Sequence, residues 1–146
     1  MLALAIHPDE TRDVEAMAAN RWTLLDADSA AATPRRYHAF VQGSKAEFGI
    51  AKSGYVRSRC GWFSDRSVCY LASGRPVIAQ DTGFTDFLPT GNGLFSFQTA
   101  DDVLTSIDSM NQDYPRHAAA ARTIAEEYFD SDKVLTRLMA RAGIAA

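Results

Sequence analysis

Polar, cationic and glycine residues gather in the segment 51–67, the first of two stretches whose residue types could bind a ligand. The candidates in this stretch are Lys52, Gly61, Ser64, Asp65, Arg66 and Ser67. Lysine and arginine bind phosphate groups as cationic donors, and serine hydroxyls add further hydrogen bonds. A helix is predicted to begin at Ser64, and its unpaired backbone N–H groups would face the same ligand. Together these groups suit a diphosphate.

The second stretch, residues 80–87, combines hydroxyl-binding side chains with a flexible turn. Gly83 permits a tight turn. The residues that could hydrogen-bond sugar hydroxyls are Asp81, Thr82, Thr85 and Asp86. Aromatic rings at Trp62, Phe84 and Phe87 could stack on a sugar or a base. Packing of Phe84 and Phe87 onto the body of the protein is the alternative interpretation.

The residues of the first stretch also have purely structural interpretations. Ser64 could serve only as a helix N-cap, and Asp65 could complement the helix dipole in the first turn. Arg66 could be a solvated surface arginine. The binding and the structural interpretation both stay open for each residue. The presence of all these residues in one loop favours binding.

Strand-like and helix-like patterns alternate along the chain and would place both stretches at one edge of a sheet. The strands are expected at residues 2–6, 22–26, 46–51, 76–79 and 94–97. Helices are expected at 8–20, 34–43 and 64–74, and three more begin near Thr99, Asp113 and Ser131. Residues 52–63 are expected to be irregular. This order predicts an α/β fold: a mostly parallel sheet of about five strands, helices on both faces and a helical C-terminal tail.

Side-chain patterns within the helical tail predict its caps and its buried face. Thr99 and Asp102 form a capping pair, and Asp113 caps the following helix. His117 is expected at an exposed or boundary position. The apolar residues predicted to face the core are Val103, Leu104, Ile107, Met110, Ala121, Ile124, Ala125, Tyr128, Val134, Leu135, Leu138 and Met139.

Composition narrows the function classes. The 146-residue chain carries a net charge of −3 with scattered basic residues, which argues against nucleic-acid binding. Cys60 and Cys69 suit buried or idle thiols in a reducing compartment, and the three histidines lack metal-ligand spacing. The short apolar N-terminal run is neither a membrane span nor a signal peptide, so a cytoplasmic location is expected.

A longer pattern extends over most of the chain from Trp22 onward. Its centre is GWFSDRSVCYLASGRPVIAQDTGF at 61–84, and the segments 45–52, 88–95 and 119–129 also fit. This pattern resembles the C-terminal, sugar-nucleotide-binding half of bacterial GT-B glycosyltransferase-like proteins. The resemblance implies a single Rossmann-like domain over residues 1–146, without the N-terminal acceptor domain of such enzymes.

The resemblance also implies a site and a substrate class. Residues 64–67 would face the diphosphate of a nucleotide-sugar donor, and residues 81–84 would face the cleft. Two glutamates common in retaining enzymes are replaced here by Gly61 and Cys69, so catalytic residues stay unassigned. The function expected is nucleotide-sugar binding without a metal. Hexosyltransferase activity would require an acceptor domain.

Two other interpretations remain. The chain could be a non-enzymatic interaction module, in which an apolar patch forms a homo-oligomer or binds a partner. It could also be a flavodoxin-like or response-regulator-like domain, which shares the strand–helix alternation. A response regulator needs clustered acidic residues at strand ends, and the first expected strand ends at Ile6-His7-Pro8 instead.

Overall fold

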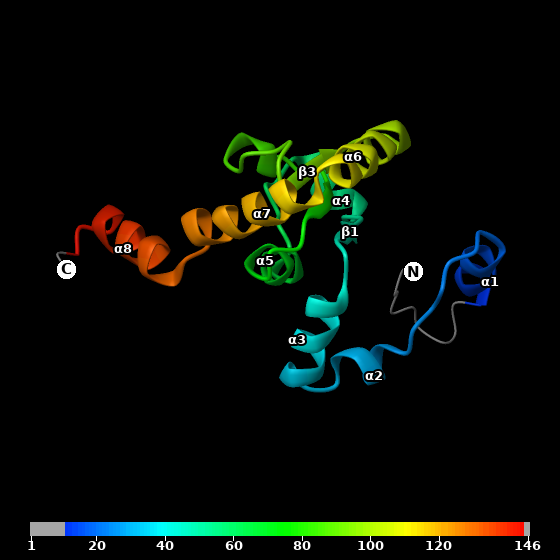
Figure 1. Ribbon diagram of the computed structural model, residues 1–146. Helices are drawn as coiled ribbons and strands as arrows, with labels where there is room; N and C mark the ends of the chain where they lie inside the picture. The colour runs from blue at the N-terminus through cyan, green and yellow to red at the C-terminus, as the bar shows by residue number, and fades with distance from the viewer. Residues whose placement is uncertain (1–10, 145–146) are drawn as a thin grey trace. The chain divides into compact units, whose positions relative to one another are not determined.

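The computed structural model describes residues 11–144 and divides the chain into two compact units, Met1–Gly43 and Ser44–Ala146 (Figure 1). The sequence predicts one domain over residues 1–146, and this stays a prediction.

The first unit is helical over its described residues. It contains α1 (Thr11–Ala19), α2 (Ala27–Ala31) and α3 (Pro34–Gly43). Helix α3 has the bounds predicted for it. The expected strand at 22–26 is wrong: these residues form no strand and none is buried, and Asp26 caps α2 by accepting hydrogen bonds from Asp28 N and Ser29 N. The expected strand at 2–6 lies outside the described residues.

The second unit is built on a parallel sheet in the order β1-β2-β3. Its strands are β1 (Glu47–Gly49), β2 (Val77–Gln80) and β3 (Leu94–Phe97). The register pairs Phe48 with Ile78 and Ile78 with Phe95. The described residues thus form three strands rather than about five. The α/β class is confirmed, and the sheet is smaller than predicted.

Helices connect and cover the strands. Two of them, α4 (Ser53–Ser58) and α5 (Asp65–Ala72), link β1 to β2, and the 3₁₀ turn η1 (Phe84–Asp86) lies between β2 and β3. The segment 52–63, expected to be irregular, therefore contains a short helix. The chain then forms α6 (Ala100–Gln112), α7 (Tyr114–Tyr128) and α8 (Ser131–Arg141), which confirms the helical C-terminal tail.

The core lies on both faces of the sheet. On one face, Ile78, Phe95 and Phe97 pack with Met110 of α6. Because side chains alternate along a strand, Val77 faces the opposite side. Helices α5 and α7 pack against each other and contact the sheet. Helices therefore cover the sheet, and the carboxyl ends of β1 and β2 are left for a pocket.

The predicted caps of α6 and α7, and the predicted glycine at the end of α5, are confirmed. Thr99 and Asp102 form a reciprocal capping box at α6, and Asp113 accepts a hydrogen bond from Arg116 N at the start of α7. Asp130 caps α8. Gly74, with a φ of 64°, follows the end of α5 as predicted.

The predicted burial of α8 is wrong, because α8 packs mainly against α7 and none of its residues is buried. The exposed fractions are 39% for Val134, 54% for Leu135, 62% for Leu138 and 37% for Met139. Leu104 of α6 is also exposed, and Cys69, expected in the core, lies exposed as a free thiol together with Cys60.

His117, which was expected at an exposed or boundary position, is buried instead. Only 3% of the residue is exposed, and its Nδ1 accepts a hydrogen bond from Gly93 N at 3.3 Å. The centroid of its ring also lies 5.0 Å from the ring centroid of Phe95.

No helix among residues 11–144 is long and apolar enough to cross a membrane.

Candidate functional site

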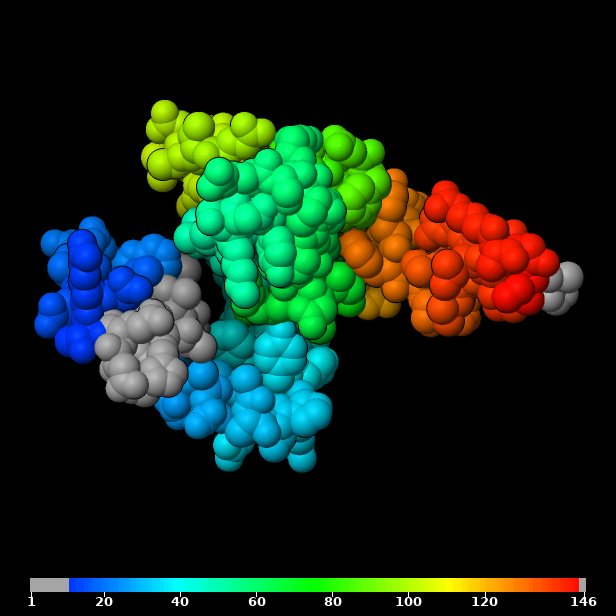
Figure 2. Space-filling view, turned by 180° about the vertical axis from the view of Figure 1, so that it is seen from behind, coloured from blue at the N-terminus to red at the C-terminus, as the bar shows by residue number. Residues whose placement is uncertain are grey.

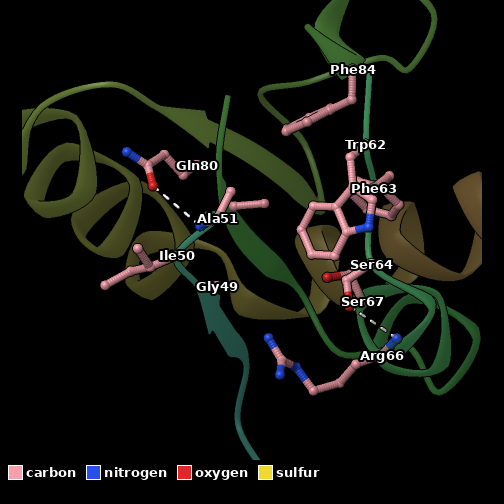
Figure 3. A pocket seen from close by; sticks show the side chains of 11 residues that line it. Gly49, Ile50, Ala51, Trp62, Phe63, Ser64, Arg66, Ser67, Gln80 and Phe84 are labelled. Atoms are coloured by element: carbon pink, nitrogen blue, oxygen red, sulfur yellow. Dashed lines mark hydrogen bonds between the residues drawn. The ribbon is translucent and has the colours of Figure 1, made fainter. Parts of the chain in front are cut away.

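A shallow pocket, whose roughly 280 Å³ of empty space includes open solvent, lies at the carboxyl ends of β1 and β2. Its lining residues are Gly49, Ile50, Ala51, Trp62, Phe63, Ser64, Arg66, Ser67, Ala79, Gln80 and Phe84. Figure 3 shows Trp62 and Ser64 on one side and Ile50 and Ala51 on the other. This is the edge where parallel sheets bind ligands. Four predicted site residues line the pocket: Ser64, Arg66, Ser67 and Phe84.

The start of α5 forms one side of the pocket. Ser64 is the N-cap, and its Oγ accepts a hydrogen bond from Arg66 N at 3.2 Å (Figure 3). Asp65 accepts from the same N–H at 2.8 Å through Oδ1. Ser67 lies in the first turn and is 2% exposed. The structural interpretation of Ser64 as a cap is confirmed, and it is compatible with a ligand beside the helix start.

Arg66 forms an ion pair that the sequence analysis did not predict. Its Nε donates to Glu47 Oε1 at 2.5 Å. The Arg66 side chain is 52% exposed, whereas that of Glu47 is 4% exposed. The second oxygen, Glu47 Oε2, is buried without a hydrogen-bond partner. A charged residue inside an otherwise apolar strand was the feature that could have identified Glu47.

Tyr70 of α5 is a third residue affected by this ion pair, and it is buried. Burial raises the pKa of Tyr70, and the nearby Glu47 carboxylate raises it further. The Tyr70 hydroxyl lies 3.3 Å from Ser44 Oγ, and this hydrogen bond and the Arg66 charge lower the pKa in part. The Glu47 carboxylate therefore acts on the Tyr70 hydroxyl as well as on Arg66.

Aromatic rings form one wall of the pocket. Trp62 is 39% exposed and stacks on Tyr55 with ring centroids 5.1 Å apart. Phe84 is 1% exposed and packs edge-on against Phe63 at 5.2 Å. The packing interpretation is therefore confirmed for Phe84, whereas Phe87 is 53% exposed. Trp62 is the ring that combines exposure with a place in the pocket wall.

Asp81 organises the second stretch through hydrogen bonds within the protein. Its Oδ1 accepts from Gly83 N at 2.8 Å and Thr85 Oγ1 at 3.3 Å. Its Oδ2 accepts from Gln98 Nε2 at 3.3 Å and Arg59 Nη1 at 3.4 Å. Burial raises the pKa of Asp81, but these hydrogen bonds outweigh it and hold the pKa below its ordinary value. The carboxylate anchors the loop.

Thr82 joins the two predicted stretches. It is fully buried, its Oγ1 donates to Trp62 O at 2.5 Å, and its carbonyl accepts from Gly61 N at 2.8 Å. Gly83 has a φ of 94°, and a Cβ there would lie 2.9 Å from Arg59 O. These contacts hold the loop beside Trp62. They do not direct Asp81, Thr82 or Gly83 toward a sugar.

The remaining predicted residues flank the pocket. Gly61 has a φ of 75° and precedes Trp62, so it sets the path of the chain into the aromatic wall. Lys52 is exposed and precedes α4, directly after the lining residue Ala51. Among residues 11–144, no group of three or more His, Cys, Asp or Glu side chains could hold a metal ion.

Comparison with known protein families, curated proteins and solved structures finds no match to this chain. The residues of the pocket themselves indicate what it could bind. It combines a guanidinium and a helix start, which bind anionic groups, with an exposed indole face, which binds flat or apolar groups.

Proposed function

We propose that the second unit is a nucleotide-binding domain of glycosyltransferase type, which binds a nucleotide sugar in this pocket. The observation that carries the proposal is the position of the pocket. It lies beyond the carboxyl ends of β1 and β2 and beside the start of α5. The resemblance of residues 61–84 to glycosyltransferase-like proteins supports the same ligand class.

Each part of such a ligand has a matching group among the residues that line the pocket. The diphosphate would lie near Ser64 and Arg66, where hydroxyl, guanidinium and backbone N–H groups meet. The base or the sugar would lie against Trp62, whose ring is held by stacking on Tyr55. In this proposal catalysis depends on an acceptor domain or partner, and no metal takes part.

A binding screen tests the proposal. The purified chain is titrated calorimetrically with UDP, GDP, dTDP and ADP, each with and without its sugar, and thermal unfolding is followed in parallel. We expect saturable binding of one nucleotide, with stabilisation of about 2.7 kcal/mol at a hundredfold excess over Kd. Absence of binding by all eight compounds would contradict the proposal.

Arg66→Lys is the matching variant, because lysine keeps a positive charge beside Glu47 but lacks the planar fork of arginine. We expect it to weaken nucleotide binding several-fold with little loss of stability. Arg116→Ala is the control, since Arg116 is exposed at the start of α7 and does not line the pocket. Equal affinity of Arg66→Lys and the wild type would remove Arg66 from the site.

The exposed stripe on α8 favours a second candidate, a self-association module. In Figure 2 the helix protrudes from the rest of its unit, and two of its apolar residues, Leu135 and Leu138, are more than half exposed. The helix has Asp130 at its start and Arg141 at its end. An antiparallel pair of copies would bring these opposite charges together while covering the stripe.

Light scattering over a range of concentrations tests self-association. We expect a weak dimer that Leu138→Lys converts to a monomer, because a charge in the stripe opposes burial. Lys133→Glu would not serve as the control, since Lys133 donates a hydrogen bond to Glu126 O. Thr136→Ser, an exposed conservative change, is used instead. A strict monomer at high concentration would rule this candidate out.

A further inference from the structure

Arg66 is the only charged residue among the pocket-lining residues that the structure describes. It does not act as an isolated cation, because Glu47 holds its Nε at 2.5 Å. A ligand that approaches Arg66 therefore meets an ion pair. The electrostatic field in the pocket depends on the carboxylate as well as on the guanidinium.

The ion pair between Glu47 and Arg66 is maintained because the Glu47 carboxylate is buried. The Glu47 side chain is 4% exposed, and Oε2 has no hydrogen-bond partner. Moving the guanidinium away would leave a buried carboxylate without compensation, which is strongly unfavourable. A bound ligand would therefore interact with the nitrogens of Arg66 while Nε remains bonded to Glu47.

Charged residues that adjoin the lining residues in sequence add to the Glu47–Arg66 pair, and together they carry both signs. Asp65 adds a second carboxylate at the start of α5, and the exposed Lys52 adds a second cation next to the lining residue Ala51. Two carboxylates thus oppose two cations. The polarity of the helix start remains, but it amounts to about half a charge and falls off within the first turn.

These charges bear on the charge of the ligand. In a nucleotide sugar each phosphate is a diester-like group with one negative charge. In a free nucleoside diphosphate the terminal phosphate carries close to two charges above pH 7, because its second pKa is about 6. The extra charge would face the field of the Glu47 carboxylate beside Arg66.

We propose that Glu47 makes the pocket selective for nucleotide sugars over free nucleoside diphosphates by opposing the additional charge on the terminal phosphate. The inference rests on the proposed function and adds the charge state of the preferred ligand. The same repulsion favours release of a free nucleoside diphosphate. Two unit charges about 6 Å apart interact strongly enough to change affinity by about threefold in water and about a hundredfold at the effective dielectric constant of a protein surface, so a change on the order of tenfold is expected for a solvent-open pocket.

Glu47→Gln tests the inference, because the amide oxygen can still accept from Arg66 Nε while the charge is removed. Dissociation constants are measured calorimetrically at pH 8 for UDP-glucose and UDP, GDP-mannose and GDP, dTDP-glucose and dTDP, and ADP-glucose and ADP. We expect the wild type to prefer the sugar form of the nucleotide it binds. The variant should bind both forms better, but its gain should be about tenfold larger for the free diphosphate, which carries the extra charge, so the preference for the sugar form should fall about tenfold.

Two further variants complete the experiment. Glu126→Gln, an exposed carboxylate paired with Arg122 on α7, is the control and should leave both constants unchanged. Asp65→Asn removes the other carboxylate at the pocket and should shift the preference in the same direction by a smaller factor. It replaces Glu47→Gln if thermal denaturation shows that the latter does not fold.

The outcomes separate the two proposals. Binding by neither the wild type nor the variants overturns the proposed function and this inference with it. Binding with the same preference in the wild type, Glu47→Gln and Asp65→Asn leaves the proposed function intact and overturns the role of Glu47. A wild type that prefers the free diphosphate also overturns it.

Discussion

At the scale of single residues, the second unit depends on contacts that only particular side chains or glycine can make. Gly93 has a φ of 75° and lies against the backbone of Ala120 and Ala121 in α7. Its N–H donates to the buried His117. Asp81 similarly fixes the loop after β2 through four hydrogen bonds. These residues support the edge of the sheet on which the pocket lies.

Gly93→Ala should be among the most destabilising single changes. A Cβ at this position would overlap the backbone N of Ala121, and no flexible side chain could move aside. We expect a loss of about 3 kcal/mol or more in the free energy of unfolding, measured with urea. Gly91→Ala is the control, since Gly91 has a φ of 97° but nothing within 4 Å of the added atom. A loss no larger than that of Gly91→Ala would contradict the steric explanation.

Asp81→Asn should show a pH-dependent cost. Because the folded state holds the pKa of Asp81 below its ordinary value, the carboxylate stabilises the protein above the unfolded pKa, which is about 3.9. This contribution is lost as the pH falls through the lower, folded pKa. The difference in unfolding free energy between the wild type and Asp81→Asn should therefore be largest near pH 7 and shrink toward pH 3. A constant difference would contradict the role of the charge.

At the scale of elements, the helices differ in how they are held. Helix α6 contributes Met110 to the core and begins with a reciprocal capping box. Helix α7 buries His117, Ala121, Ile124 and Ala125. Helix α8 is capped by Asp130 but has no buried residue. Its stability therefore depends on the cap, on its contact with α7 and, in the self-association candidate, on a second copy.

Thr99→Ala tests the start of α6. The change removes the oxygen that accepts from Asp102 N at 3.2 Å and leaves that N–H without its cap. We expect a loss of about 1 kcal/mol in unfolding free energy. Thr105→Ala is the matched control, because Thr105 is exposed within the same helix and bonds only to the carbonyl of Asp101. Equal losses for the two variants would show that the cap adds nothing specific.

At the scale of the whole molecule, the sheet, its covering helices and the pocket all belong to the second unit. Helices α1 and α2 of the first unit contain no buried residue. The proposed binding function thus resides within residues 44–146. The fold needed for it is a three-stranded parallel sheet, which is small but has apolar residues packed on both faces.

Residues 44–146 should therefore fold and bind alone. We expect this fragment to unfold cooperatively, and its nucleotide dissociation constants should lie within about twofold of those of the full chain, since its core and pocket are internal. Thermal denaturation and calorimetry on the fragment and the full chain make the comparison. A fragment that lacks cooperative unfolding would show that the second unit depends on the first.

The sequence by itself determined the features that depend on neighbours within about four residues. The bounds of α3, the N-cap at Ser64, the capping box at Thr99 and the strand at 94–97 all follow local patterns and were predicted correctly. It also determined the α/β class and placed Ser64, Arg66 and Ser67 at one pocket, because a strand–helix alternation with a predicted helix start fixes that edge.

Only the tertiary structure decided which patterns find partners. Residues 22–26 have a strand-like composition but form no strand, and the apolar stripe of α8 remains exposed, because pairing and burial require surfaces from elsewhere in the chain. The pairing of Arg66 with Glu47, 19 residues away, likewise follows from the packing of α5 beside β1. Local patterns specify elements, whereas the contacts between distant elements determine the charge of the site.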